Sequence, residues 1–166
     1  MQSGSVVFLK ESTIRDTPNV PQKSSRPYVL VRDRKNRYIF WAVPLSGQLN
    51  KYNRIVSQKR ARFGTCHSLY VDSKHAYLIQ NMIPVTAEDI CRSLAAHEKN
   101  KFCTQREYST VARKVRRCLS LLNKVPPLRV TFTPAMELYR EKEKELNRPR
   151  LNLIRSTTGV ERKKEM

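Results

Sequence analysis

The amino-acid sequence predicts an α+β fold, with a small antiparallel, partly closed sheet in its first half and helices in its second. Short runs rich in Val, Ile, Tyr, Phe and Trp, separated by polar turn residues, recur up to residue 85. Further on, apolar residues recur at three- and four-residue spacing, which is typical of amphipathic helices. With 166 residues, we expect one domain over residues 1–150 and a basic tail over 151–166.

The first strands follow from β-rich runs and turn residues. Ser5 to Leu9 is a short strand, and Lys10 to Ser25 is a loop with one helical turn. Tyr28 to Val31 and Tyr38 to Val43 form a hairpin across the polar segment 32–37. We expect Pro44 to end the second strand, because proline lacks the N–H that a ladder needs.

The remaining segments alternate between turn and periodic patterns. Residues 51–62 are basic with few apolar residues, so they form either a solvated helix or an exposed loop. Ser68 to Val71 and Ala76 to Ile79 predict a second hairpin, and Met82 to Val85 completes the sheet.

Helix-start signals dominate the second half. The segment 86–89, Thr-Ala-Glu-Asp, has the form of a capping box, which predicts a helix from Ile90. The segment 104–107 has the same capping-box form and precedes a helix with an apolar stripe. Thr133 and Pro134 predict another helix start, with fraying after Pro149. The apolar stripe of the helix that follows residue 104 consists of Tyr108, Val111, Ala112, Val115, Leu119 and Leu122.

The charge predicts a polyanionic partner. Lys and Arg number 33 and Asp and Glu 14, which gives a net charge of +19. Between Lys23 and Arg62 eleven cations face one acid, Asp33, and aromatic residues alternate with them, a combination that suits single-stranded nucleic acid. The alternative is a basic but passive surface. The candidate RNA-binding residues are Lys23, Arg32, Arg37, Tyr52, Arg54, Lys59, Arg60, Arg62, His67, Gln80, Asn81, Arg113, Lys114, Arg116 and Arg117.

Other classes of site are not expected. Cys66, Cys91, Cys103 and Cys118 lack the close pairs of a structural zinc site, so we expect reduced thiols, no metal and no cofactor. No segment is long and apolar enough to be a signal peptide or to span a membrane, so we expect a cytoplasmic protein. Acids are too few in the first hundred residues for a two-metal nuclease.

RNA offers chemistry without a metal, because its own 2′-hydroxyl can attack the adjacent phosphate. Ser46 with Lys51 is the best local candidate for such a site, although Ser46 can equally shape a turn and Lys51 can be a solvated cation. His67 can be an acid or base, or a plain polar residue. Gln80 and Asn81 can read base edges or cap strand ends.

Four segments, in this order, carry a resemblance: 26–28 (Arg-Pro-Tyr), 39–46 (Ile-Phe-Trp-Ala-Val-Pro-Leu-Ser), 51–52 (Lys-Tyr) and 76–85 (Ala-Tyr-Leu-Ile-Gln-Asn-Met-Ile-Pro-Val). Together they resemble the toxins of type III toxin–antitoxin systems, the ToxN, AbiQ and CptN group, with CptN-like members closest. The resemblance runs from about Ser25 to Val85 and extends through the helices to about Leu146.

This resemblance implies a compact, curved sheet similar to the barrel of Kid and MazF toxins, with attached helices, and a metal-independent endoribonuclease active on cellular or phage RNA. It implies antiviral defence by abortive infection and a small repeat RNA antitoxin that folds into a pseudoknot, is processed by the toxin and bridges an oligomer. The catalytic positions carried over are Ser46, Lys51 and Arg26. Gly47 stands where many members have a second hydroxyl residue.

Two other functions remain open. One is a non-catalytic RNA-binding protein, in which the same basic and aromatic residues bind RNA but cut nothing. The other is a type II ribonuclease toxin, which shares the chemistry but is inhibited by a protein.

Overall fold

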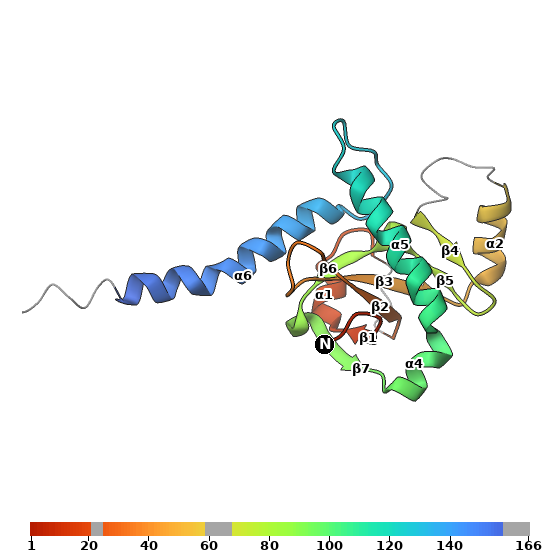
Figure 1. Ribbon diagram of the computed structural model, residues 1–166, viewed down its shortest axis with the longest axis horizontal. Coiled ribbons are helices and arrows are strands. Elements are labelled where there is room, and N and C mark those ends of the chain that lie inside the picture. The colour runs from red at the N-terminus through yellow and green to blue at the C-terminus, as the bar shows by residue number, and fades with distance from the viewer. Residues whose placement is uncertain (21–24, 59–67, 158–166) are drawn as a thin grey trace, which may run out of the picture.

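A computed structural model describes residues 1–20, 25–58 and 68–157 and confirms the α+β prediction. Its centre is a curved antiparallel sheet with the strand order β4-β5-β3-β2-β1-β7, and β6 pairs with β3 beside this path (Figure 1). The path ends at β4 and β7, so the sheet does not close into a barrel. The strands are β1 (Val6–Leu9), β2 (Pro27–Arg32), β3 (Phe40–Ser46), β4 (Tyr70–Val71), β5 (Ala76–Tyr77), β6 (Ile83–Val85) and β7 (Ile90–Ser93).

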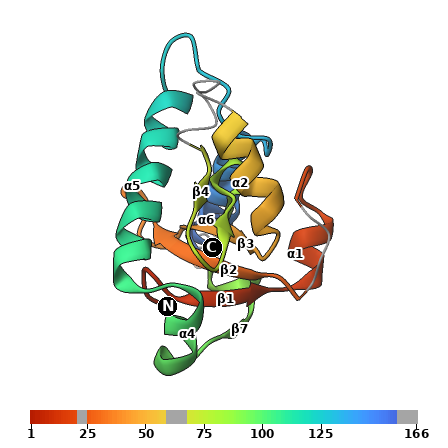
Figure 2. The same cartoon turned by 90° about the vertical axis from the view of Figure 1, so that its right-hand side faces the viewer.

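Helices and 3-10 turns surround this sheet. They are α1 (Glu11–Arg15), α2 (Leu49–Gln58), η1 (Ile79–Asn81), η2 (Ala87–Asp89), α4 (Ala96–Phe102), α5 (Gln105–Leu122) and α6 (Ala135–Thr157). In Figure 2, α5 and α1 lie on opposite sides of the sheet. No helix in the described part of the chain is both long enough and apolar enough to cross a bilayer.

Both hairpins follow the sequence prediction. β2 pairs with β3 from Tyr28 opposite Pro44 to Arg32 opposite Phe40, and β4 pairs with β5. Side chains alternate along each strand, so the sheet has two buried faces. Val31 and Trp41 lie in one core cluster with Val115 of α5. Leu30 lies in the other cluster, together with Ile14 of α1.

The prediction that Pro44 ends the second strand is wrong, because β3 continues through it to Ser46. Along its other edge, β3 pairs with β6 up to Ala42 and with β5 from Leu45. Pro44 lies between these two partners, and its carbonyl accepts a hydrogen bond of 2.9 Å from the Leu78 N–H. No described strand residue pairs with Pro44 on this edge, so the missing N–H of the proline costs no hydrogen bond of the ladder.

The helix predicted from Ile90 is also wrong. The capping box forms, since Thr86 and Asp89 bond to each other, but it caps only the 3-10 turn η2. The next residues form β7, which pairs with the free edge of β1 in a register that sets Ser93 opposite Val7. Pairing with an open strand edge here outweighs the local helix signal.

The predicted helix after residue 104 is α5. The Glu107 N–H donates to the Thr104 hydroxyl over 3.4 Å and the Thr104 N–H to the Glu107 carboxylate over 2.6 Å. Its buried residues are Val111, Ala112, Val115, Cys118 and Leu121. Tyr108, Leu119 and Leu122 of the predicted stripe are half-buried.

The last helix, α6, begins close to the predicted position. The Thr133 hydroxyl just before it donates to the Met82 carbonyl over 2.7 Å and so joins the start of α6 to the sheet. The helix continues past Pro149 to Thr157, so it crosses the predicted domain boundary at residue 150, and the boundary itself stays a prediction. In Figure 1 the helix extends away from the sheet.

A buried aspartate joins the β2–β3 loop to α6. Asp33 accepts hydrogen bonds from the Trp41 indole N–H (2.9 Å) and the Tyr139 hydroxyl (2.9 Å). It also accepts the backbone N–H groups of Lys35 and Asn36, each over 2.8 Å. Burial by itself raises the pKa of Asp33, but these four hydrogen bonds together hold the pKa below its ordinary value. The charged carboxylate therefore contributes to stability at neutral pH.

We predict that Asp33→Asn lowers the free energy of unfolding by roughly 2–3 kcal/mol at pH 7, because hydrogen bonds to a charged acceptor are lost. Since the folded-state pKa is depressed, this contribution is present above the unfolded pKa of about 3.9 and is lost as the pH falls toward the folded value. Urea unfolding at pH 7 and in steps below pH 4 measures it, and the difference from wild type shrinks on acidification.

The matched control for this prediction is Asp16→Asn. Its carboxylate lies in solvent near Arg15, with 76% of its side chain exposed, so we expect little change. An Asp33→Asn variant as stable as the control at pH 7 contradicts the structural role of Asp33.

Candidate functional site

Two polar residues singled out by the sequence, Arg26 and Ser46, lie with Tyr28 on one face at the open end of the β2–β3 hairpin. Tyr28 pairs with Pro44, and the same register continued by two residues sets Arg26 opposite Ser46. A hydrogen bond of 3.1 Å from Arg26 Nη1 to the Leu45 carbonyl fixes the arginine there. Because side chains alternate along a strand, Arg26, Tyr28 and Ser46 share a face.

Two buried polar atoms at this end lack a hydrogen-bond partner among the described residues: Arg26 Nε and the Tyr28 hydroxyl. Burial raises the pKa of Tyr28 to about 12, although the positive charge of Arg26 partly opposes this shift. The phenol therefore keeps its proton at neutral pH and is a hydrogen-bond donor beside a guanidinium. Such a pair suits an anionic ligand.

Ser46 ends β3 and is 6% exposed. Its hydroxyl oxygen accepts the Gln48 N–H over 3.3 Å, which leaves the hydroxyl proton to donate elsewhere. A Cβ added to neighbouring Gly47 would meet no atom within 4 Å, so the turn faces open space. A large ligand can therefore approach Ser46 from the side of Gly47.

Lys51 lies in the first turn of α2, three residues after Gln48. It is exposed, and its ammonium lies 5.4 Å from the centre of the Tyr52 ring. Tyr52 is buried in a small core with Leu69 and Leu78. This packing anchors α2 next to Ala76 of β5, which pairs with Ser46, and among the described residues Lys51 forms no ion pair.

The other predicted RNA-binding residues lie in different places. Arg32 and Arg37 are exposed at the closed end of the hairpin, over the rings of Phe40 and Tyr38 respectively. Arg54 is exposed on α2; on α5, Arg113, Arg116 and Arg117 are exposed and Lys114 is half-buried. Lys23, Lys59, Arg60, Arg62 and His67 lie outside the described residues.

Gln80 and Asn81 have structural contacts in η1. The Asn81 side chain donates to the Asn19 carbonyl over 3.1 Å and is 8% exposed. The Gln80 carbonyl accepts the Phe132 N–H over 2.6 Å. These bonds join η1 to two distant loops, and base reading by either side chain stays a prediction.

Sequence reasoning did not assign a role to Tyr28. The signal that identifies it is its spacing from Arg26, because residues two apart on a strand share a face. His75 is a candidate partner for Ser46, since it precedes Ala76, the residue paired with Ser46. Its ring instead stacks on Phe102 with centres 5.6 Å apart, and alternation directs it to the opposite face.

The chemistry of the cluster follows from its donor set. Arg26 and Lys51 are cations, and Tyr28 and Ser46 are hydroxyl donors. Such groups hold and polarise a phosphate, whereas divalent metals require carboxylate or imidazole ligands. In the described part of the chain, no group of three or more His, Cys, Asp or Glu residues is placed to hold a metal.

We predict that Tyr28→Phe leaves the free energy of unfolding unchanged or raises it by up to about 1–3 kcal/mol, because it removes an unpaired buried hydroxyl. Thermal or urea unfolding measures the change. Tyr139→Phe is the matched control, because its hydroxyl donates to Asp33, and we expect that variant to be less stable. A loss of stability in Tyr28→Phe as large as in the control would contradict the assignment of an unpaired hydroxyl.

Comparisons with known proteins bear on the fold. No family model matches the chain, and no curated protein matches it by sequence. Among solved structures, the chain is similar to one from work on the mechanism of bacterial type III toxin–antitoxin systems, in which a non-coding RNA pseudoknot selectively inhibits the toxin. The match has a TM-score of 0.56 and 18% identity, and it covers 85% of this chain and 96% of that chain. The protein therefore shares its overall fold with this neighbour over most of its length.

Proposed function

We propose that this protein is a toxin of the type III kind, a metal-independent endoribonuclease that cuts single-stranded RNA and is inhibited by a small folded RNA. The observation that carries the proposal is the group of Arg26, Tyr28 and Ser46, with two unpaired buried donor atoms, on a fold shared with a structure from such a system. The resemblance of the hairpin segments to the ToxN, AbiQ and CptN group supports the same assignment.

The reaction is an internal transesterification of RNA. The 2′-oxygen attacks the adjacent phosphorus, the bond from phosphorus to the 5′-oxygen breaks, and the products carry a 2′,3′-cyclic phosphate and a 5′-hydroxyl. Water takes the proton of the 2′-hydroxyl and water also supplies the proton that the departing 5′-oxygen receives, so the protein itself gains and loses no proton. Negative charge grows on the phosphate oxygens during this step, so donors already aimed at them accelerate it.

Each residue of the cluster has a role in this proposal. Arg26 and Lys51 hold the phosphate charge. Tyr28 keeps its proton at neutral pH and is 0% exposed, so it stays a neutral neighbour of Arg26 and does not itself contact the RNA. Ser46 directs its hydroxyl proton to the attacking ribose, while its oxygen stays bonded to the Gln48 N–H. Arg26, Tyr28 and Ser46 lie at the open end of the hairpin, Lys51 follows in the first turn of α2, and the turn at Gly47 leaves room for the RNA strand.

The proposed partner is a small repeat RNA that folds into a pseudoknot and bridges copies of the toxin. The net charge of +19 exceeds what one short scissile segment neutralises. Exposed arginines also lie on α5, away from the open end of the hairpin. An extended folded RNA reaches both regions, and cellular or phage RNA is then the substrate when the inhibitor is absent.

Metal-free cleavage is the direct test of the chemistry. We predict that the purified protein cuts a labelled single-stranded RNA in EDTA, because the attacking group belongs to the substrate and the donors belong to the protein. An RNA with 2′-deoxyribose at the cut site resists. Cleavage that stops in EDTA and returns with magnesium overturns the mechanism, and binding without any cleavage favours a non-catalytic RNA-binding protein.

A second prediction concerns the residues. Ser46→Ala and Lys51→Ala each lower the rate of RNA cleavage on the order of a hundredfold or more, because each removes a donor to a developing charge. The controls are Ser73→Ala and Lys101→Ala, which alter exposed residues far from the cluster in sequence. Initial rates under single-turnover conditions, with thermal melts for all four variants, measure the effect. Rates equal to those of the controls remove Ser46 and Lys51 from the site.

A further inference from the structure

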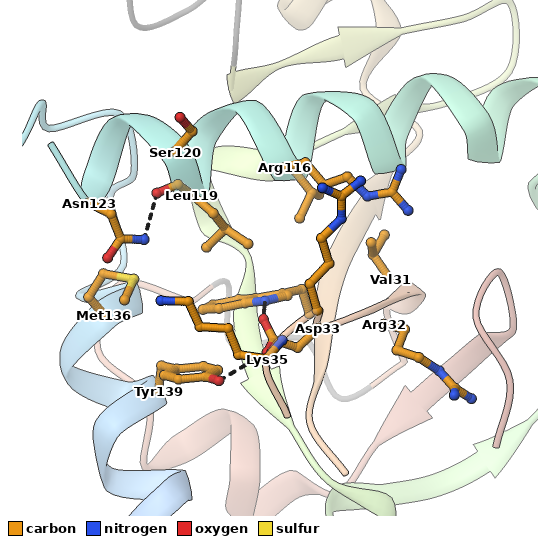
Figure 3. A pocket seen from close by; sticks show the side chains of 13 residues that line it. Val31, Arg32, Asp33, Lys35, Arg116, Leu119, Ser120, Asn123, Met136 and Tyr139 are labelled. Atoms are coloured by element: carbon orange, nitrogen blue, oxygen red, sulfur yellow. Dashed lines mark hydrogen bonds between the residues drawn. The ribbon is translucent and has the colours of Figure 1, made fainter. Parts of the chain in front are cut away.

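A cavity lies at the closed end of the β2–β3 hairpin, where the loop after β2 approaches the C-terminal half of α5 and the start of α6. Its volume is about 230 Å³. Figure 3 shows Leu119 and Ser120 of α5 on one side and Asp33, Lys35 and Tyr139 on the other. This volume is below the roughly 300–1,000 Å³ of typical small-molecule sites, so it has room for a nucleobase whose sugar and phosphates stay outside.

The interior of the cavity is apolar and rigid. The rings of Trp41 and Tyr139 stack with their centres 5.5 Å apart and their planes 9° from parallel. Asp33 holds both rings through hydrogen bonds of 2.9 Å. The half-buried side chains of Leu119 and Met136 complete an apolar lining next to this pair. A flat apolar group such as a nucleobase fits against such a lining.

The rim of the cavity is cationic. Four of its lining residues are basic and one, Asp33, is acidic, and the carboxylate of Asp33 is already occupied by four hydrogen bonds. Among the described residues, none of the four cations forms an ion pair with a carboxylate. The four are Arg32, Arg34, Lys35 and Arg116. An apolar interior within an uncompensated positive rim is complementary to a nucleotide, with its flat base and its phosphate.

Polar groups at the far end of the cavity allow contact with a base edge. The Asn123 side chain donates to the Leu119 carbonyl over 2.8 Å, as Figure 3 shows. Its carbonyl oxygen then remains an acceptor for an amino group of a base. Ser120 adds a hydroxyl beside it.

This cavity is separate from the cluster around Ser46. Trp41 lines the cavity, and Ser46 lies five residues further along the same strand. At about 3.4 Å per residue, the two sites are roughly 17 Å apart along β3. One bound nucleotide cannot occupy both.

We propose that this cavity is a second RNA site, which binds one unpaired nucleotide of the folded RNA partner, with the base against Leu119 and Met136 and the flanking phosphates on Lys35 and Arg116. The inference rests on the proposed RNA partner. The occupant is an RNA strand and not a free nucleotide, because cations on both the β2–β3 loop and α5 line the cavity and a strand brings phosphates on both sides of the base. The site anchors RNA remote from the chemistry.

The chain contains a single tryptophan, Trp41, and it lies in this cavity, so its fluorescence reports occupancy directly. The full-length protein is titrated with a single-stranded 2′-O-methyl RNA, which cannot be cleaved and carries a dye for an independent anisotropy measurement. We expect the emission of Trp41 to change in a saturable way with the same midpoint as the anisotropy.

Two kinds of variant test the contacts. The double substitution Lys35→Glu and Arg116→Glu weakens RNA binding by roughly tenfold per contact and lowers the magnitude of the log–log salt slope by about 1.4. Lys10→Glu with Lys101→Glu is the matched control, because it changes the net charge equally at exposed positions elsewhere. Ser120→Tyr fills the cavity from an exposed helix position and abolishes the fluorescence change.

Three results overturn the inference: RNA binding with no change in Trp41 emission, equal weakening in the two double variants, or saturation by adenosine monophosphate at the same concentration as by the RNA strand. The last result identifies a free-nucleotide site. The cleavage assay in EDTA reports separately on the proposed function, since it uses a short substrate at Ser46. Cleavage without a fluorescence change refutes the second site alone, and a fluorescence change without cleavage refutes the nuclease alone.

Discussion

The hydrogen bonds that converge on Asp33 connect the two halves of the molecule. This carboxylate closes the β2–β3 loop through the N–H groups of Lys35 and Asn36. It also holds Trp41 of β3 and Tyr139 of α6, whose rings stack on each other. A second acid, Asp89, binds Lys142 one turn further along α6 over 3.0 Å. Two buried aspartates therefore fix α6 to the sheet, and the loop geometry at the closed end of the hairpin follows from the first.

The β2–β3 hairpin places both candidate sites. Strand β3 is buried along its whole length and pairs with β2, β5 and β6, so its register is fixed from several sides. Its last residue, Ser46, meets Arg26 at the open end. Near its first residues, Trp41 meets Tyr139 and Asp33 at the closed end. A rigid strand between the sites sets the distance between them, which a bound RNA has to match.

The sequence predicts the elements whose causes are local. Alternation and turn residues were enough for both hairpins, and the capping box at Thr104 was enough for the start of α5. The prediction failed where a residue distant in the sequence determines the local structure or the role of a side chain. Ile90 begins a strand because the edge of β1 is free, and the role of Asp33 depends on Tyr139, 106 residues away. Ser46 was expected on a turn after Pro44, whereas it is the last residue of β3, and its approach to Arg26 required the strand register.

Three of the 14 acids in this chain stabilise the fold, and their carboxylates are therefore not available to pair with the surface cations. Asp33 and Asp89 are buried and bind the fold together, and Glu107 caps α5. These carboxylates neutralise almost none of the arginines on α5 or at the hairpin ends, because their oxygens face backbone N–H groups, hydroxyls and one lysine. The acids that stabilise the fold therefore do not screen the cations at the surface. A polyanion that contacts those cations releases counterions without competing with any interaction that the fold requires.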